Sequence, residues 1–101
     1  MDTALYDRIR EAILDVPVGK VSTYGHIAML VGAPSPRMVG ALLAEEGSDL
    51  PWHRILRSNG TPTPHLVAEQ LQRLRAEGVI SVGQRVDLRE YLWDPQGGLA
   101  D

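Results

Sequence analysis

Two short helical segments joined by a tight turn constrain the fold of this chain more than any other feature. In VSTYGHIAMLVGAPS, Ser22 or Thr23 is placed to cap the first segment and Gly32 to end it. Ser35 and Pro36 then open the second segment, because proline is favoured at the first helical position, where its missing N–H is not needed. Short helices joined by a glycine-containing turn of roughly three or four residues are typical of a helix-turn-helix.

The second helix, expected to end at Glu45 or Glu46, divides into an inner and an outer face. The residues spaced to meet a core are Val39, Leu42 and Leu43. The outer face carries one long side chain and then three of the smallest, at positions i, i+3, i+4 and i+7: Arg37, Gly40, Ala41 and Ala44. We name Gly40, Ala41 and Ala44 the smooth face.

The rest of the chain is expected to build one domain around this unit. Apolar residues at helical spacing predict a helix over residues 3–15, capped by Thr3. Its inward stripe is Leu5, Ile9, Ala12, Ile13 and Val16. A strand is predicted over 54–57, a turn at SNGT, a helix over 65–76, and short extended pieces in VISVG and RVDLREYLW. The inward residues of the later helix are Val67, Leu71 and Leu74. The fold prediction is mainly α: a single small domain over residues 1–101, with a winged-helix-like helix-turn-helix and a few short strands.

Composition narrows the class of protein. With 44% hydrophobic and 23% charged residues, the 101-residue chain is ordinary for a soluble domain with one core. No apolar run approaches the roughly 18 residues of a membrane span and no signal peptide is recognised, so a cytoplasmic protein without a membrane partner is expected. The chain has no cysteine, which excludes disulfides, thiolate–metal sites and thiol nucleophiles. Its three histidines lack ligand-like spacing, and no metal site is predicted.

The net charge of −3 argues mildly against nucleic acid, because binding to the phosphate backbone depends on Lys and Arg. The charge is unevenly distributed, however. Residues 17–64 hold four basic against three acidic side chains, whereas acidic residues outnumber basic ones on both sides of this stretch. The least acidic part of the chain therefore contains the helix-turn-helix.

The smooth face admits two interpretations. Small side chains cannot read base edges in the major groove, but they let a helix come close to another surface. The minor groove is about 6 Å wide and a helix about 10 Å across, so only a smooth helix could be pressed into it, with widening. Proteins that do so bend the duplex and wedge a side chain into the stack, and Arg37 is long enough to be that wedge. In the other interpretation the smooth face packs against a helix of the same domain, and Arg37 is a solvated charge.

The segment DLPWHRILRSNG places an indole, an imidazole and two guanidiniums beside turn residues. On pattern alone Trp52 is either ordinary core or part of a site. His53 suggests acid–base chemistry, but no nucleophile or partner carboxylate is identifiable, which favours structural hydrogen bonding. Tyr24 is either a phosphate contact or a half-buried aromatic. The TPTP run predicts a stiff exposed loop, either a lid or a connector. Trp93 is predicted to lie in the core.

Three motifs in this order and spacing, GKVSTYGHIA, SPRMVGALLA and LPWHRILRSNGT, resemble the DNA-binding domain of the O6-alkylguanine-DNA alkyltransferases. Those enzymes carry Pro-Cys-His-Arg-Val in the third motif and transfer the alkyl group to that cysteine. This chain has Pro-Trp-His-Arg-Ile, with Trp52 at the cysteine position. With this substitution, and with RVDLREYLW near the C-terminus, the chain resembles the alkyltransferase-like proteins, which lack the nucleophile.

The resemblance implies roles for residues at matching positions. Arg37 would replace a flipped nucleotide in the stack, Tyr24 would press on the neighbouring phosphate, and Gly40 and Ala41 would allow the close approach to the minor groove. Trp52 would line the pocket that receives the alkylated guanine. The wall of that pocket and the turn beside it would be formed by His53, Arg54, Asn59 and Gly60.

The implied protein binds double-stranded DNA containing O6-alkylguanine, has no catalytic residue, and needs no cofactor or metal. Its other partners would be nucleotide excision repair damage-recognition proteins, and it would act as a monomer, nucleoid-associated when on DNA. The alternative is a helix-turn-helix transcriptional regulator or protein-interaction module without lesion specificity; a residual enzyme is the third reading. The family's glycine-rich lid is replaced here by Thr61–Pro64, with no Lys or Arg before Arg73, and the recognition helix ends in Glu45-Glu46. These departures predict that the protein binds undamaged DNA more weakly, and with more salt sensitivity, than a basic relative would.

Overall fold

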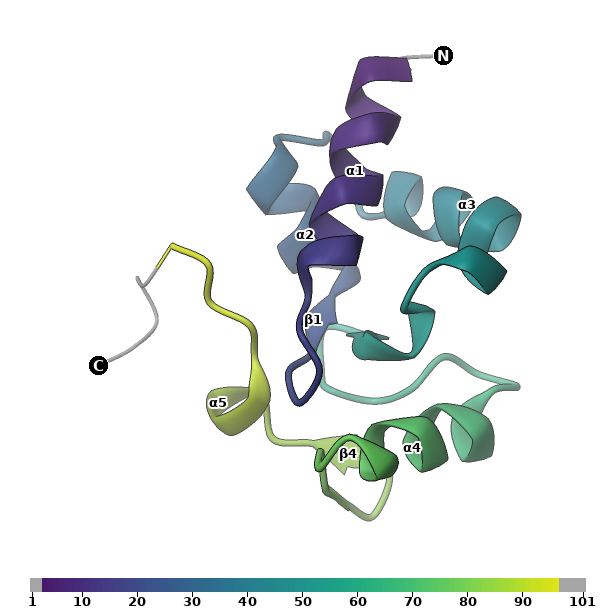
Figure 1. Ribbon diagram of the computed structural model, residues 1–101, viewed down its shortest axis with the longest axis vertical. Helices are drawn as coiled ribbons and strands as arrows, with labels where there is room; N and C mark the ends of the chain where they lie inside the picture. Colours follow the sequence, from purple (N-terminus) through teal and green to yellow (C-terminus); the bar gives the residue numbers. More distant parts are fainter. Residues whose placement is uncertain (1–2, 97–101) are drawn as a thin grey trace.

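The structure, a computed structural model, describes residues 3–96 and confirms the mainly α fold with a few short strands (Figure 1). The helices are α1 (Thr3–Asp15), α2 (Tyr24–Val31), α3 (Arg37–Glu46), α4 (Val67–Ala76) and α5 (Leu88–Tyr91), with short 3-10 turns η1 (Gly47–Asp49) and η2 (Trp52–Arg54). The strands are β1 (Ser22–Thr23), β2 (Ile55–Leu56), β3 (Ser81–Val82) and β4 (Arg85–Val86). Within residues 3–96, no helix combines the length and hydrophobicity that a membrane crossing requires.

The helix-turn-helix forms where local signals place it. The Thr23 hydroxyl accepts the His26 backbone N–H at 3.0 Å and caps α2. Gly32 ends the helix with φ of 73°, a conformation that glycine adopts without steric cost. The α3 helix begins at Arg37, one residue later than predicted, so Pro36 is its N-cap and not its first helical residue; the Ser35 hydroxyl accepts the Arg37 N–H at 3.1 Å.

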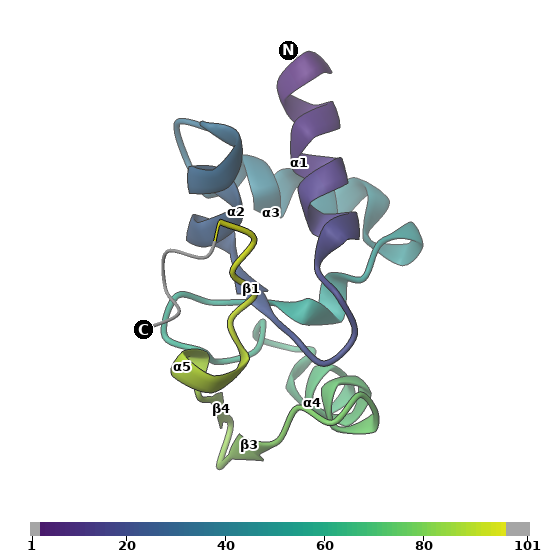
Figure 2. The same cartoon turned by 60° about the vertical axis from the view of Figure 1, so that its left-hand side comes forward.

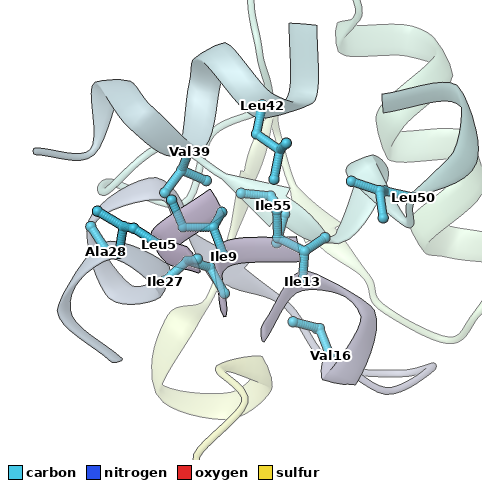
Figure 3. Close-up of a cluster of buried hydrophobic side chains, with 10 residues drawn as sticks. All are labelled: Leu5, Ile9, Ile13, Val16, Ile27, Ala28, Val39, Leu42, Leu50 and Ile55. Carbon is cyan, nitrogen blue, oxygen red and sulfur yellow. The ribbon is translucent and has the colours of Figure 1, made fainter. Parts of the chain in front are cut away.

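A first hydrophobic cluster joins α1, α2 and α3 (Figure 3). Its members are Leu5, Ile9, Ile13, Val16, Ile27, Ala28, Val39, Leu42, Leu50 and Ile55. The predicted inward stripe of the first helix is buried except for Ala12, which is partly buried. The predicted cap at Thr3 is wrong, because Thr3 is already a helical residue of α1. Arg10 fixes the far end of α3 to α1 through two hydrogen bonds to the Glu46 carboxylate, at 2.7 and 2.8 Å.

A second, smaller cluster lies beneath the first and consists of Val21, Leu56, Leu74, Val79 and Val86. The two clusters meet at β1 and β2, which pair in parallel with Ser22 opposite Ile55. Figure 2 shows α4 and the β3–β4 hairpin together at the end of the molecule opposite the start of α1. That antiparallel hairpin is the wing of the predicted winged-helix-like domain.

Several predicted boundaries are wrong. The strand predicted over 54–57 is limited to Ile55–Leu56, because Arg54 belongs to the η2 turn. The helix predicted over 65–76 begins at Val67, since His65 has a φ of 73° that a right-handed helix does not allow. Part of RVDLREYLW, predicted as extended, forms α5, whose N-terminus is capped by the Asp87 carboxylate. Trp93 is half-buried against the first cluster rather than fully enclosed.

Candidate nucleic-acid interface

A cavity of about 420 Å³ opens between α3, the start of α2, the η2 turn and the loop before α4. Its lining residues are Tyr24, Gly40, Leu43, Ala44, Gly47, Ser48, Trp52, Thr63 and Leu66. All of these side chains are uncharged, and most are apolar or very small. The volume is within the range of roughly 300–1,000 Å³ typical of small-molecule sites. We name this space the Trp52 cavity.

The smooth face of α3 is exposed at Ala41 and Ala44 and half-buried at Gly40, and it forms one rim of the Trp52 cavity. Gly40 and Ala44 line the cavity, while Ala41 and Arg37 lie on the same outer side, both exposed. A Cβ added at Gly40 would meet nothing within 4 Å outside its own helix. The interpretation in which this face packs against another helix of the domain is therefore wrong. The remaining interpretation is that α3 presents a face without bulky side chains to a surface outside the domain.

Trp52 forms a wall of the cavity and is held by its neighbours. Its indole lies edge-on to the His53 imidazole, with ring centroids 6.2 Å apart and planes at 84°. The Arg73 guanidinium lies 5.5 Å from the indole centroid, a cation–π distance. Arg73 is in turn paired with Glu69, one turn earlier on α4, at 2.8 Å. The half-buried indole thus has contacts that fix its orientation and still reaches the cavity.

Behind Trp52, His53 and Arg54 converge on one carboxylate, that of Glu77. Arg54 donates from Nε and Nη2 to the two carboxylate oxygens at 2.9 and 2.8 Å, and His53 Nε2 lies 2.8 Å from Oε2. Arg54 Nη1 also donates to the Val16 carbonyl at 2.9 Å. These hydrogen bonds, first those from Arg54 and then that from His53, outweigh burial and lower the Glu77 pKa from 4.5 to about 2. We name these three side chains the Glu77 clamp.

The Glu77 clamp supports the structural role predicted for His53, and it supplies the partner carboxylate that the sequence did not reveal. Glu77 is separated from His53 by 24 positions, and no spacing rule connects them. Neither His53 nor Arg54 lines the Trp52 cavity; both stand behind its wall. Their contacts are those of residues that hold the η2 turn in place.

A second network missed by sequence reasoning is centred on the fully buried Gln70. Its amide nitrogen donates to the carbonyls of His53 and Ile55 at 3.0 and 2.8 Å, and its oxygen accepts the Thr63 N–H at 2.9 Å. These bonds tie the η2–β2 segment and the TPTP loop to α4. The apolar spacing of α4 gave no signal for this residue, because a glutamine in a helix is ordinarily read as surface.

Tyr24 reaches across the cavity to the TPTP loop. Its hydroxyl lies 2.9 Å from the Thr63 hydroxyl, and its ring packs against the first cluster. It is half-buried and also faces the cavity, so the two roles weighed for Tyr24 are compatible. The loop itself is only partly exposed: Pro62 is buried, which corrects the expectation of an exposed run.

Asn59 and Gly60 shape the turn after β2, as the motif implies, but they lie outside the Trp52 cavity. The Asn59 side-chain oxygen accepts the Thr61 N–H at 3.1 Å, and Gly60 has φ of 84°. A side chain at Gly60 would collide with the Val86 carbonyl, so the turn and wing are in close contact there. Asn59 contributes to another cavity, of about 610 Å³, beside the wing. Among the residues described, no group of three or more His, Cys, Asp or Glu side chains could hold a metal ion.

The fold and the site together define a class of protein: a helix-turn-helix domain whose second helix presents a smooth outer face beside an uncharged, tryptophan-walled cavity. Residues 4–79 match the family described as "6-O-methylguanine DNA methyltransferase, DNA binding domain", and the chain belongs to that family.

The relatives narrow this to the alkyltransferase-like proteins, as the motifs predicted. The chain is 38% identical over 102 residues to alkyltransferase-like protein 1 of Schizosaccharomyces pombe, covering 89% of this chain and 94% of that protein. It is 41% identical over 95 residues to a DNA base-flipping protein of Escherichia coli, covering 86% and 72%. The crystal structure of S. pombe Atl1 with damaged DNA containing O6-carboxymethylguanine matches with a TM-score of 0.81 at 34% identity, covering 94% and 98% of the two chains.

Proposed function

We propose that this protein recognises O6-alkylguanine in double-stranded DNA without repairing it. It binds through the minor groove, flips the lesion into the Trp52 cavity and flags it for nucleotide excision repair. The observation that carries this proposal is the position of Trp52. At the position where the alkyltransferases have their cysteine, this chain places an indole that lines an uncharged cavity next to the smooth face.

The energetics of such a site favour holding a damaged base. Flipping a nucleotide costs a few kcal/mol, and less where pairing is already weakened, as it is for an O6-alkylated guanine. Stacking against an aromatic side chain returns roughly 1–3 kcal/mol per base. An indole offers a flat apolar face to the base and the alkyl group, but it has no thiolate to accept that group. The lesion is therefore bound and not removed.

The route into the cavity follows from the exposed side of α3. The smooth face allows the helix backbone to approach a widened minor groove. Arg37 stands at the start of that face, long and exposed, and fills the gap left by the flipped nucleotide. Tyr24, on the cavity rim, contacts the adjacent phosphate through its hydroxyl. The names of the relatives, a base-flipping protein and an Atl1 complex with damaged DNA, support this assignment.

The link to excision repair follows from the absence of alkyl transfer. A protein that binds the lesion but has no acceptor for the alkyl group leaves the damage in the DNA. Repair then requires other proteins, and the bent duplex with its flipped base is the signal that we propose damage-recognition proteins read.

A fluorescence anisotropy titration tests the proposal with matched duplexes containing guanine or O6-methylguanine at one position. We expect the protein to bind the O6-methylguanine duplex at least about tenfold more tightly than the guanine duplex, which corresponds to about 1.4 kcal/mol. Arg37→Ala should remove most of that difference, whereas Arg8→Ala, which deletes an equal charge on α1, should preserve it. Equal affinities for the two duplexes, or a preference for one unmodified sequence, would support a helix-turn-helix regulator instead. Transfer of a labelled alkyl group from DNA to the protein would contradict the non-enzymatic assignment.

A further inference from the structure

We infer that Thr63 is a positioning residue for DNA binding: it donates a hydrogen bond to the Tyr24 hydroxyl and so directs the single Tyr24 proton to a DNA phosphate. This inference rests on the proposed function, in which Tyr24 contacts the phosphate beside the flipped nucleotide. It adds a residue that lies outside the three sequence motifs. It comes from the contact between the two hydroxyls and from the way in which Thr63 is held.

The hydroxyls of Tyr24 and Thr63 lie 2.9 Å apart, and either of them can be the donor. Tyr24 is the first residue of α2, whereas Thr63 belongs to the TPTP loop before α4, and both line the Trp52 cavity. Each hydroxyl has one proton to donate and two lone pairs that accept. The free protein therefore has two arrangements of this pair, one with Tyr24 as the donor and one with Thr63 as the donor.

A DNA phosphate is compatible with only one of these arrangements. Its two free oxygens are acceptors, because a phosphodiester carries no proton at neutral pH. Tyr24 must then donate its proton to the phosphate, and its bond to Thr63 persists only if Thr63 is the donor. The result is a chain of two hydrogen bonds that run in the same direction, from Thr63 to Tyr24 and from Tyr24 to the phosphate. Hydrogen bonds in such a chain polarise and strengthen one another.

Thr63 can position the tyrosine because its own backbone is held on both sides. Its N–H donates to the side-chain oxygen of the fully buried Gln70 at 2.9 Å, and its carbonyl accepts the Leu66 N–H at 3.2 Å. Pro62 and Pro64 flank it and restrict the backbone of the loop further. The Thr63 hydroxyl thus has a fixed place opposite Tyr24 before DNA binds, which reduces the freedom that the tyrosine loses on binding.

Thr63→Val tests the inference, because it removes the hydroxyl, keeps nearly the same shape and leaves both backbone hydrogen bonds in place. We expect it to weaken binding to the O6-methylguanine duplex by about fivefold, as for the loss of one hydrogen bond, and Thr63→Ser to bind within about twofold of wild type. Thr61→Val is the matched control, since the Thr61 hydroxyl donates to Asn59 and does not line the cavity. Wild-type affinity in Thr63→Val, or no recovery in Thr63→Ser, would overturn the inference; a thermal melt verifies that each variant folds.

Because Thr63 lines the Trp52 cavity, its action through Tyr24 must be separated from direct contact with the lesion. Tyr24→Phe has no hydroxyl to position. In that background we expect Thr63→Val to change the affinity by less than about twofold, whereas independent roles would give the same fivefold loss as in the wild type. The second result would assign Thr63 to the lesion itself and refute the inference.

The phosphate provides a measurement that leaves Tyr24 unchanged. Duplexes can carry a neutral methylphosphonate, a poorer acceptor, at either phosphate flanking the lesion. We expect one of them to weaken wild-type binding and to bring wild type and Thr63→Val within about twofold of each other. If neither duplex did so, the chain of hydrogen bonds would have no phosphate at its end and the inference would be wrong. Equal wild-type affinities for O6-methylguanine and guanine would instead contradict the proposed function itself, which the other negative results leave intact.

Discussion

Glu77→Gln tests whether the Glu77 clamp holds the wall of the Trp52 cavity. The substitution keeps the shape of the side chain and removes its charge. The Arg54 guanidinium, whose side chain is only 14% exposed, would then lose its counter-ion, and the three short bonds to the carboxylate could not all form. Removing one member of a buried ion pair costs roughly 3–5 kcal/mol. Because the clamp keeps some contact with water, we expect a loss of about 2–3 kcal/mol in the free energy of unfolding at pH 7.

The pH dependence gives an independent measure of the same interaction. The pKa of Glu77 is lowered by Arg54 and His53 from 4.5 to about 2 in the folded protein. A carboxyl group with a lowered folded-state pKa contributes its stabilisation fully above its unfolded pKa, and loses it as the pH falls. The stability of the wild-type protein should therefore decline from about pH 4.5 toward pH 2, by at most about 3 kcal/mol from this group. In Glu77→Gln this component of the decline should be absent.

Urea unfolding followed by tryptophan fluorescence and far-UV circular dichroism measures both effects, because Trp52 lies directly against the clamp. Glu69→Gln is the matched control: it neutralises a carboxylate in an exposed Glu69–Arg73 pair, with both side chains about half exposed, and should cost less than about 1 kcal/mol. If Glu77→Gln changed stability no more than Glu69→Gln, and the acid limb of the wild-type profile persisted in Glu77→Gln, the clamp would not stabilise the fold.

Three further substitutions probe the scaffold and the smooth face. Gly40→Leu should weaken lesion binding by about tenfold or more by filling the rim of the cavity. It should not reduce stability, because a Cβ at this position meets nothing within 4 Å and glycine inside a helix costs roughly 0.5–1 kcal/mol. A titration paired with a thermal melt separates binding from stability, and unchanged affinity would remove the smooth face from the interface. Gln70→Leu should cost about 2–4 kcal/mol by leaving buried carbonyls of His53 and Ile55 unpaired, whereas Gln72→Leu, at an exposed position, should be nearly neutral in the same urea unfolding. Gly60→Ala should lower the free energy of unfolding by more than about 1 kcal/mol, because the added Cβ collides with the Val86 carbonyl. Gly83→Ala, at another positive φ but in open space, should lower it less in the same urea unfolding. A smaller loss for Gly60→Ala than for Gly83→Ala would contradict the close contact of turn and wing.

The helix-turn-helix was predictable because its signals are local. Thr23, Gly32 and the Ser35-Pro36 pair each act within a few residues of their own position, and each ends or begins a helix where expected, within one residue. Helical spacing correctly predicts that Val39 and Leu42 of α3 are buried, whereas Leu43, predicted to face inward, is half-buried and lines the Trp52 cavity. Only the surroundings of the outer face were undecided, because its small residues suit both packing against another helix and close approach to DNA.

The support of the site was not predictable, because it depends on contacts between distant segments. Glu77 follows α4 and the η2 turn precedes it, so the two are far apart in sequence. The buried residues of α4 are Gln70 and Leu74, whereas Val67 and Leu71, which were predicted to face inward, are only half-buried. The parallel pairing of β1 with β2 involves two residues from each strand, too few for any periodic pattern. Such pairings are chosen by the tertiary fold and not by local propensity.

The hydrogen bonds that fix the η2 turn do not use the side chain at position 52. The backbone of this segment is held by the Gln70 amide at the carbonyls of His53 and Ile55, and its flanking side chains are held by Glu77. Residue 52 itself uses its backbone N–H for Leu50 at 2.7 Å, a bond that any residue except proline could make. Its side chain is therefore free to change its chemistry while the turn keeps its position. A scaffold built in this way can present a cysteine or an indole to the same cavity, which gives a physical basis for alkyl transfer in one branch of the family and lesion holding in the branch proposed for this protein.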